Sequence, residues 1–174
     1  MECLVKINFN MGKLEWEMYQ DIPYREIGST NDIYGTDITK FKDYLKQYIK
    51  DETLPNLNFH DVTTNRYIYY VDDYPIGEVG IRTSLNDFWT KNGSQLFYKV
   101  RLSERRKGHG MRMMKLALAE CKKLGFKKVR INCSDRNYGS QKIIIKNGGK
   151  VDPTKRNYKT HEGTCSSYIV QLNG

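Results

Sequence analysis

Residues 98–114, YKVRLSERRKGHGMRMM, decide the fold. An alternating strand pattern runs into a short basic loop that contains Gly108 and Gly110, and this loop opens directly into an amphipathic helix. Glycine lets the backbone approach a ligand closely, and the first N–H groups of a helix have no intrahelical partners. The helix dipole adds about half a positive charge at this end, beside the basic run 105–107. The stretch therefore predicts a binding site for an anion such as a diphosphate.

Two other kinds of phosphate-binding loop do not fit these residues. A Walker A loop needs G-x-x-x-x-G-K-[ST], which occurs nowhere in the sequence. A dinucleotide fingerprint needs a third glycine, where this chain has Met113, and an acidic residue about 20 residues later. The next predicted strand carries Lys127 and Lys128 in place of that acid. The alternative without a ligand is a basic loop that only caps a helix.

Hydrophobic periodicity predicts the elements on both sides of this stretch. Strands are expected over residues 3–9, 66–71, 76–82, 95–102, 127–133 and 163–172. Helices are expected over 13–20, 38–49, 111–124 and 137–147. Residues 24–36, 51–64 and 150–160 are predicted as loops or turns, and 84–94 as a short helix and a loop. On the helix after the glycines, one apolar face is expected from Met111, Met114, Leu118 and Cys121.

The composition is that of an ordinary globular protein, with 39% apolar and 28% charged residues in 174. This length fits one domain. No run approaches the roughly 18 consecutive apolar residues of a membrane span, and the first residues, MECLVKIN, lack the layout of a signal peptide. We therefore expect a cytoplasmic protein without a membrane partner.

The cysteines and histidines are scattered, without the spacing of a metal site: Cys3, Cys121, Cys133, Cys165, His60, His109 and His161. Reduced thiols that pack as small apolar residues are the simplest interpretation. We expect no metal.

The net charge of +9 is divided unevenly along the chain. Residues 1–100 hold 11 Lys and Arg against 15 Asp and Glu, whereas residues 101–174 hold 18 against 5. The C-terminal half is therefore expected to meet an anionic ligand, either a nucleic acid or a small molecule with several phosphates.

Two motifs now point to a family. The glycine loop, residues 105–110 (RRKGHG), resembles the R/Q-x-x-G-x-G/A acetyl-CoA loop of the GNAT acetyltransferase superfamily, in its usual place between a strand and a helix. Residues 137–149, NYGSQKIIIKNGG, resemble the family's N-x-x-S/A-x-x-x-Y-x-K-x-G-F segment. Residues 98–110 and 81–86 (IRTSLN) are also similar to segments of a subfamily of uncharacterised predicted acetyltransferases. The similarity spans roughly residues 38–172 and is strongest in 95–149.

The resemblance implies an α/β (α+β) fold with a mixed, mostly antiparallel sheet of about seven strands, a central splay and helices on both faces. One acetyltransferase domain would span residues 1–174. Within it, residues 1–94 would form the N-terminal and acceptor-side elements, 95–149 the acetyl-CoA-binding core and 150–174 the C-terminal strands.

The resemblance also implies transfer of an acetyl group from acetyl-CoA to a primary amine, by direct attack in a ternary complex and without a metal. The strand ending at Val100 and Leu102 would pair with the pantetheine arm, and an N–H near Val100 would polarise the thioester carbonyl. Asn137 and Ser140 would contact pantetheine at the splay. Backbone N–H groups of the glycine loop would hold the diphosphate, which assigns cosubstrate binding to Arg105, Arg106, Lys107, Gly108, His109 and Gly110.

One position departs from the family pattern. The tyrosine that often protonates the leaving thiolate is Ile144 here. Tyr168 on the last strand is the first candidate for the acid, with Tyr138 and Cys133 as weaker ones. For the base that takes the proton of the amine, the candidates are Glu78, Asp87 and Tyr98. Arg82 and Asn86 are expected to line the acceptor pocket.

Two alternatives remain beside the enzyme. A nucleic-acid-binding module would use the basic C-terminal half, but residues 101–130 hold eleven Lys and Arg and a single aromatic residue, Phe126, which disfavours base stacking. A degenerate protein that binds acyl-CoA without turnover is the second, because of Ile144. The acceptor amine is not identified, although the acidic balance of residues 1–100 slightly favours a cation; the oligomeric state, including a homodimer, stays open.

Overall fold

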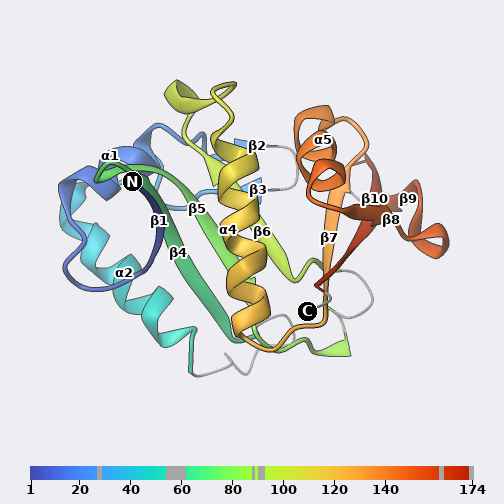
Figure 1. Cartoon of the computed structure of the whole chain (residues 1–174). Helices are drawn as coiled ribbons and strands as arrows, with labels where there is room; N and C mark the ends of the chain where they lie inside the picture. Colours follow the sequence, from blue (N-terminus) through green and yellow to red (C-terminus); the bar gives the residue numbers. More distant parts are fainter. Residues whose placement is uncertain (27–28, 54–61, 88, 90–92, 161–162, 173–174) are drawn as a thin grey trace.

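Two antiparallel sheets stand side by side in the computed structural model (Figure 1), which describes residues 1–26, 29–53, 62–87, 89, 93–160 and 163–172. The first sheet has the order β1-β4-β5-β6, with the bounds Glu2–Lys6, Thr64–Val71, Tyr74–Arg82 and Leu96–Val100. The second has the order β7-β10-β8, with the bounds Lys128–Ser134, Gly163–Gln171 and Gly149–Val151, and β9 (Tyr158–Thr160) pairs with β10. A separate two-stranded hairpin consists of β2 (Arg25–Glu26) and β3 (Ser29–Thr30).

Helices cover both faces of the first sheet. The described helices are α1 (Lys13–Gln20), α2 (Phe41–Lys50), α4 (His109–Lys123) and α5 (Tyr138–Lys146). Short 3-10 turns span Ile38–Lys40, Leu102–Glu104 and Pro153–Lys155. Along β4, Ile68 packs in a cluster with α1 and α2, whereas Tyr67 and Tyr69 pack in a cluster with α4. Because alternate residues of a strand point to opposite faces, these helices lie on opposite sides of the sheet.

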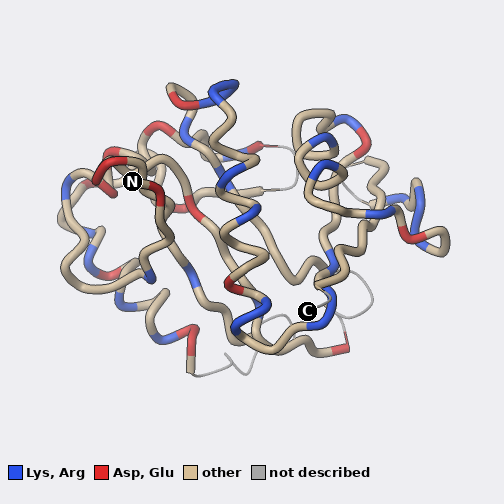
Figure 2. Tube along the Cα trace, in the orientation of Figure 1, with Lys and Arg blue, Asp and Glu red and all other residues tan. Residues whose placement is uncertain are grey.

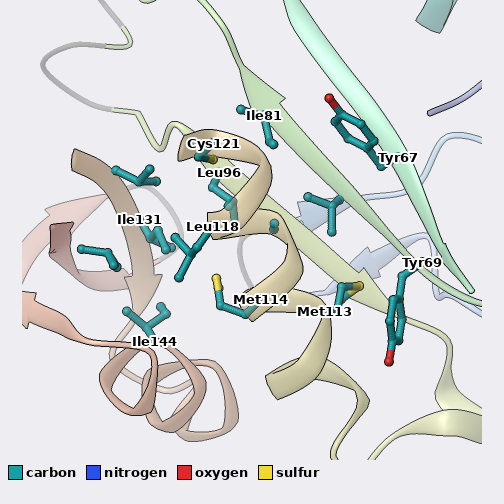
Figure 3. Close-up of a cluster of buried hydrophobic side chains, with 14 of the residues drawn as sticks. Tyr67, Tyr69, Ile81, Leu96, Met113, Met114, Leu118, Cys121, Ile131 and Ile144 are labelled. Carbon is teal, nitrogen blue, oxygen red and sulfur yellow. The ribbon is translucent and has the colours of Figure 1, made fainter. Parts of the chain in front are cut away.

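The helix α4 forms because its buried residues recur every three to four positions: Met113, Met114, Ala117, Leu118 and Cys121. Figure 3 shows four of these side chains, Met113, Met114, Leu118 and Cys121, in a cluster with Ile81, Leu96 and Ile131 of the two sheets, so α4 bridges both. Each fully buried large apolar side chain contributes about 1.5–3 kcal/mol. The predicted apolar face included Met111, which is instead half-buried and faces a cleft; Met113 takes its place in the core.

The two sheets touch at the start of β6 and β7 and then separate. The N–H of Gln95 donates to the carbonyl of Arg130 over 2.8 Å, and the N–H of Asn132 donates to Oγ of Ser94 over 2.8 Å. No strand pairing between β6 and β7 is present in the described residues beyond this point. The two strands run in the same direction and are connected by α4 (Figure 1). This splay, together with helices on both faces, confirms the predicted fold class.

Several predicted boundaries differ from the structure. Residues 24–36, predicted as a loop, contain the β2–β3 hairpin, and residues 150–160 contain part of β8 and all of β9. The turn between β4 and β5 is tighter than predicted, because Asp72 and Asp73 adopt φ values of 47° and 63° in the left-handed region. The predictions for residues 54–61, 88 and 90–92 lie outside the described residues.

Within the described ranges, no helix has the length and apolar character that crossing a membrane requires. The same part of the chain holds no group of three or more His, Cys, Asp or Glu side chains placed to bind a metal ion. His60 and His161 lie outside the described residues, and the cysteines are free thiols.

Candidate functional site

The glycine loop places free backbone donors at the start of α4. Gly108 is the N-cap of this helix with φ of 82°, which favours glycine because a Cβ is strained there. No acceptor in the described part of the chain takes the backbone N–H groups of residues 106–110. A Cβ added at Gly110 would lie 2.8 Å from Cδ1 of Ile143, so glycine lets α4 approach α5. These free donors lie at the positive end of the helix dipole, where the sequence analysis predicts an anion site.

A cleft of about 710 Å³ begins at the glycine loop and continues between β6 and α5. The β2–β3 hairpin contributes Glu26 and Ser29 to its wall. Of the predicted cosubstrate residues, those that line it are Val100, Arg105, Arg106, Gly108, His109, Gly110, Asn137 and Ser140. The cleft therefore brings together the two motifs that are separated in the sequence.

The strand predicted over residues 95–102 ends before Leu102 in the structure. Leu102 was expected to pair with the pantetheine arm, but β6 ends at Val100, and Leu102 begins the 3-10 turn with 49% of its surface exposed. The reason is that the guanidinium of Arg101 pairs with Asp21 over 2.9 Å, and the N–H of Leu102 donates to the carbonyl of Asp21 over 2.8 Å. These bonds draw the chain away from the strand direction toward the end of α1.

Acidic partners neutralise most cations of the glycine loop. Arg105 forms a bidentate pair with Glu26 over 2.6 and 2.7 Å, and Lys107 lies 3.1 Å from both carboxylate oxygens of Glu104. Lys107 is exposed and does not line the cleft. Only the exposed Arg106, with φ of 64°, has no ion pair among the described residues of this loop. The expected full charge of Arg105 and Lys107 is therefore offset in this structure.

His109 is the first residue of α4 and is nearly buried. Its Nε2 lies 3.4 Å from Glu104, and its Nδ1 lies 2.9 Å from a guanidinium nitrogen of Arg112. Arg112 in turn pairs with Glu2 over 2.6 Å. The ring of His109 is therefore held by Glu104 and Arg112, and Arg112 is held in turn by Glu2, so that the backbone of His109, rather than its ring, is available to a ligand.

Two further cations line the cleft on the side of α5, and the sequence analysis did not single them out. Arg136 and Lys142 are exposed and make no ion pair in the described part of the chain. Figure 2 shows basic positions before and along α4 and on through the C-terminal part, with acidic positions gathered in the N-terminal part. The uneven charge along the sequence thus becomes an uneven charge in space, with the cleft near the boundary.

The strand β6 presents backbone donors to the splay. The N–H of Arg101 donates to Ile76 over 3.0 Å, and the carbonyl of Gln95 accepts from Arg82 over 2.8 Å, so the odd-numbered residues bond toward β5. In an antiparallel ladder the alternate residues point the other way. The N–H groups of Tyr98 and Val100 therefore point toward the splay, and the carbonyl of Val100 accepts from Nε of Arg105 over 2.9 Å.

The start of α5 faces these donors across the splay. Asn137 caps the helix, because its Oδ1 accepts from the N–H of Ser140 over 3.0 Å. The hydroxyl of Ser140 lies 2.7 Å from the hydroxyl of Tyr98, which connects α5 to β6. Burial raises the pKa of Tyr98 to about 12, so this phenol stays protonated at neutral pH. Tyr98 therefore suits a hydrogen-bond donor better than the base that the sequence analysis considered.

The predicted acid Tyr168 does not reach the cleft. It lies on β10, is 4% exposed and packs in the core with Met114 and Ile131. Ile144, at the family's tyrosine position, is fully buried in the same cluster (Figure 3). Tyr138 lines the cleft at the start of α5 and is 70% exposed. Among these tyrosines, Tyr98 is the half-buried one whose hydroxyl lies at the splay.

The two carboxylates predicted as bases, Glu78 and Asp87, are also not at the cleft surface. Asp87 is exposed and does not line the cleft. Glu78 is fully buried; Oε1 pairs with Arg66 over 2.6 Å and Oε2 lies 3.7 Å from Nζ of Lys99. Burial alone would raise the pKa of Glu78, but Lys99 and Arg66 outweigh it and hold that pKa below its ordinary value. The carboxylate is therefore charged, and Lys99 stands between it and the cleft.

Arg82 and Asn86 lie at the other end of the sheet from the glycine loop. The guanidinium of Arg82 stacks 3.8 Å from the ring centroid of Trp89, and it donates to the carbonyl of Ser94. Oδ1 of Asn86 accepts from the N–H of Trp89 over 3.0 Å. Neither lines the cleft, so a contact with the acceptor, as predicted from the sequence, stays a prediction.

Comparisons with known proteins agree with this geometry. The model of the acetyltransferase (GNAT) family matches residues 29–148, more than half of the chain. No curated protein matches the sequence.

Solved structures resemble the whole chain. The microcin C7 self-immunity acetyltransferase, in complex with acetyl-CoA and AMP, has a TM-score of 0.68 at 15% identity over 98% of this chain and 92% of that one. A spermidine N-acetyltransferase chimera from Vibrio cholerae has a TM-score of 0.66 at 10% identity, covering 98% and 95%. An aminoglycoside acetyltransferase in complex with coenzyme A has a TM-score of 0.65 at 14% identity, also covering 98% and 95%. At these identities the likeness concerns the fold.

Proposed function

The chain belongs to the acetyltransferase (GNAT) family, and we propose from this premise that it transfers the acetyl group of acetyl-CoA to a primary amine. The observation that carries the proposal is the continuous cleft from the free N–H groups of residues 106–110 to the splay at Val100. Acetyl-CoA is long and carries a diphosphate at some distance from its thioester. It fits a cleft in which the N–H groups of the glycine loop can bind the diphosphate at one end and the N–H groups of β6 can bind the thioester at the other. Gly108, in the left-handed conformation and without a side chain, lines the cleft and leaves room for the diphosphate.

Each part of acetyl-CoA has a counterpart in the cleft. The diphosphate would accept hydrogen bonds from the glycine loop, with Arg106 as the unpaired cation. The pantetheine arm would lie in the splay between β6 and α5, beside Asn137. Its acetyl carbonyl would accept from the N–H of Val100, which stabilises the negative charge that develops on the oxygen.

The reaction would be a direct transfer. The lone pair of a neutral amine attacks the carbonyl carbon, the C–S bond breaks, and the electron pair leaves with the sulfur of CoA as a thiolate. The proton lost by the nitrogen goes to solvent, and the thiolate takes up a proton in turn. The enzyme would contribute proximity and an oriented thioester.

The leaving thiolate would be stabilised by the hydroxyl pair across the splay. Tyr98 and Ser140 lie 2.7 Å apart, and both line the cleft. Because its pKa is raised to about 12, Tyr98 remains a donor over the whole working pH range. This assigns to a strand residue the part that the family often gives to a helix tyrosine.

The test is the release of thiol from acetyl-CoA in the presence of a broad panel of amines, read with a thiol reagent and confirmed by the mass of the acetylated product. We expect amine-dependent release. Binding of CoA without release for any amine would contradict transfer and favour an acyl-CoA-binding protein. Retention on heparin without binding of CoA would favour the nucleic-acid-binding alternative.

A further inference from the structure

The face of the first sheet turned toward α1 and α2 carries an uncompensated positive charge. Arg66 and Lys99 share the single carboxylate of Glu78, at 2.6 and 3.7 Å. No other carboxylate in the described ranges pairs with either cation. Only 19% of the Arg66 side chain, 9% of the Lys99 side chain and none of the Glu78 side chain are exposed. Two cations and one anion therefore lie largely removed from water.

The nearby polar groups do not supply the missing negative charge. Burial raises the pKa of Tyr19 and Tyr48, so both phenols are neutral. The hydroxyl of Tyr19 and Oε2 of Glu78 are buried without a hydrogen-bond partner. Arg82 stands further along the same face and adds another cation. Because an unpaired buried charge is costly, this face favours a ligand that brings an anion.

Lys99 connects this face to the cleft. It lines the cleft, and its Nζ donates to the carbonyl of Thr30 in the β2–β3 hairpin. An ammonium group has three donors, so the bond to Thr30 and the long contact with Glu78 leave one for a ligand. Its side chain points to the face opposite that of Tyr98 and Val100, because neighbouring residues of β6 alternate. An anion at Lys99 would therefore belong to the acceptor rather than to acetyl-CoA.

A carboxylate, that of Glu26, lines the same cleft as Lys99. Glu26 is paired with Ser29 in the hairpin, next to Thr30, and its guanidinium partner Arg105 also binds the carbonyl of Val100. A carboxylate accepts about four hydrogen bonds, of which the bidentate pair with Arg105 uses two. Glu26 thus has oxygen lone pairs left to accept hydrogen bonds from a ligand. It is connected through the guanidinium of Arg105 to Val100, the end of the strand at which we propose that the thioester binds. The lining of the cleft therefore contains both a cation, Lys99, and a carboxylate, Glu26.

We propose that the acceptor is an amine carrying a carboxylate or a phosphate, whose anionic group is bound by Lys99 and whose amino group is received by Glu26. This rests on the proposed transfer of acetyl to an amine and names the class of its second substrate. Lys99 is then a residue that determines specificity, and Arg105 positions Glu26. The acidic balance of the N-terminal half, which slightly favours a cation, is overruled locally by the excess of Lys99 and Arg66 over Glu78.

The experiment uses acceptor pairs that differ only in the anionic group. Phenylalanine is compared with phenethylamine to test the carboxylate, and O-phosphoethanolamine with ethanolamine to test the phosphate. We expect the anionic member of at least one pair to have the higher kcat/KM, by about 10- to 100-fold, the usual worth of one hydrogen bond to a charged group. A preference for the neutral member in both pairs would overturn the proposal.

Variants assign the preference to residues. Lys99→Met should abolish it while leaving the affinity for CoA unchanged, and Lys99→Arg, which keeps the charge, should retain most of it. Lys115→Met removes an exposed cation on α4 outside the cleft and serves as the matched control. A preference that persists in Lys99→Met, or one lost equally in Lys115→Met, would contradict the role of Lys99. Thermal unfolding checks that each variant is folded. If Lys99→Met does not fold, the anionic preference of Lys99→Arg is the result that tests the role of Lys99.

Glu26→Gln tests the other half of the site. It should raise KM for both members of a pair to a similar extent, and an unchanged KM would remove Glu26 from the proposal. The two proposals fail differently: amine-dependent thiol release with no anionic preference overturns only this inference. No release with any amine overturns the proposed function and this inference with it.

Discussion

The charge of a single side chain at residue 108 tests the placement of the diphosphate. Gly108→Asp and Gly108→Asn add side chains of the same shape to the left-handed N-cap of α4. The strain of an L residue at φ of 82° costs about 1–2 kcal/mol, and Asn and Asp are among the residues that tolerate it best. Because this cost is common to both variants, the ratio of their affinities for CoA isolates the charge.

The magnitude follows from Coulomb's law. A carboxylate about 5 Å from one phosphate charge, at an effective dielectric constant of about 20, is opposed by roughly 3 kcal/mol. The Cβ at residue 108 would lie 2.8 Å from a guanidinium nitrogen of Arg112, which offsets part of the repulsion, so we count one phosphate charge rather than two. A difference of about 3 kcal/mol corresponds to an affinity roughly 100-fold lower for Asp than for Asn.

Calorimetric titration of each variant with CoA measures this ratio. Repeating it at higher ionic strength should reduce the ratio, since salt screens exposed charges beyond about 10 Å at 0.1 M and beyond shorter distances at higher concentrations. Equal affinities of the two variants would show that no phosphate lies at Gly108, and the assignment of the glycine loop would be wrong. A ratio independent of salt would point to a change of shape instead of charge.

Three further substitutions test the rest of the site. Tyr98→Phe should lower kcat about tenfold, because one hydrogen bond to the thiolate is lost, without changing KM for acetyl-CoA. Because the pKa of Tyr98 is about 12, the wild-type enzyme should show no loss of rate from this group below about pH 11. Glu78→Gln should lower the free energy of unfolding by about 3 kcal/mol at pH 7, because it leaves Arg66 and Lys99 without a counter-charge. Since the folded pKa of Glu78 is below 4.5, this difference in urea unfolding should be complete above that pH and shrink as pH falls through the folded value. Tyr168→Phe should leave the rate of thiol release unchanged, because its side chain lies in the core, and a slower rate would return Tyr168 to the candidates for the acid.

The local parts of the site could be predicted from the sequence. The glycine loop, the cap at Asn137 and the helices that follow them depend on residues within a few positions of one another. The end of β6 could not, because the alternating pattern continues to Leu102 while the chain is turned by Arg101 and its distant partner Asp21. Periodicity reports only what neighbouring residues favour, and a long-range ion pair can override it.

The sequence analysis did not predict the part of the cleft lined by Glu26, Ser29 and Lys99, for a related reason. Glu26 and Ser29 belong to a segment of turn-forming residues without periodicity, and they reach the cleft because Glu26 pairs with Arg105, 79 positions away. Lys99 lies within the predicted strand 95–102, and the alternating pattern does not distinguish it from its neighbours. The change from an acidic to a basic balance along the chain indicated an anionic ligand, but it did not indicate which charged residues form ion pairs with one another. Pairing decides which charges are left for a ligand.

The proposed role of the Tyr98 hydroxyl at the splay would replace a motif residue that this chain lacks. The sequence reveals that the family's tyrosine position is Ile144, and its burial shows that this side chain now completes the core. Gly149 packs closely against this side chain, because a Cβ at Gly149 would lie 2.4 Å from Cγ2 of Ile144. Tyr98 reaches the cleft from β6, and its hydroxyl lies 2.7 Å from that of Ser140 on α5. Because a donor near a leaving thiolate is defined by its place in space, a hydroxyl from β6 can fill a role that the motif assigns to α5.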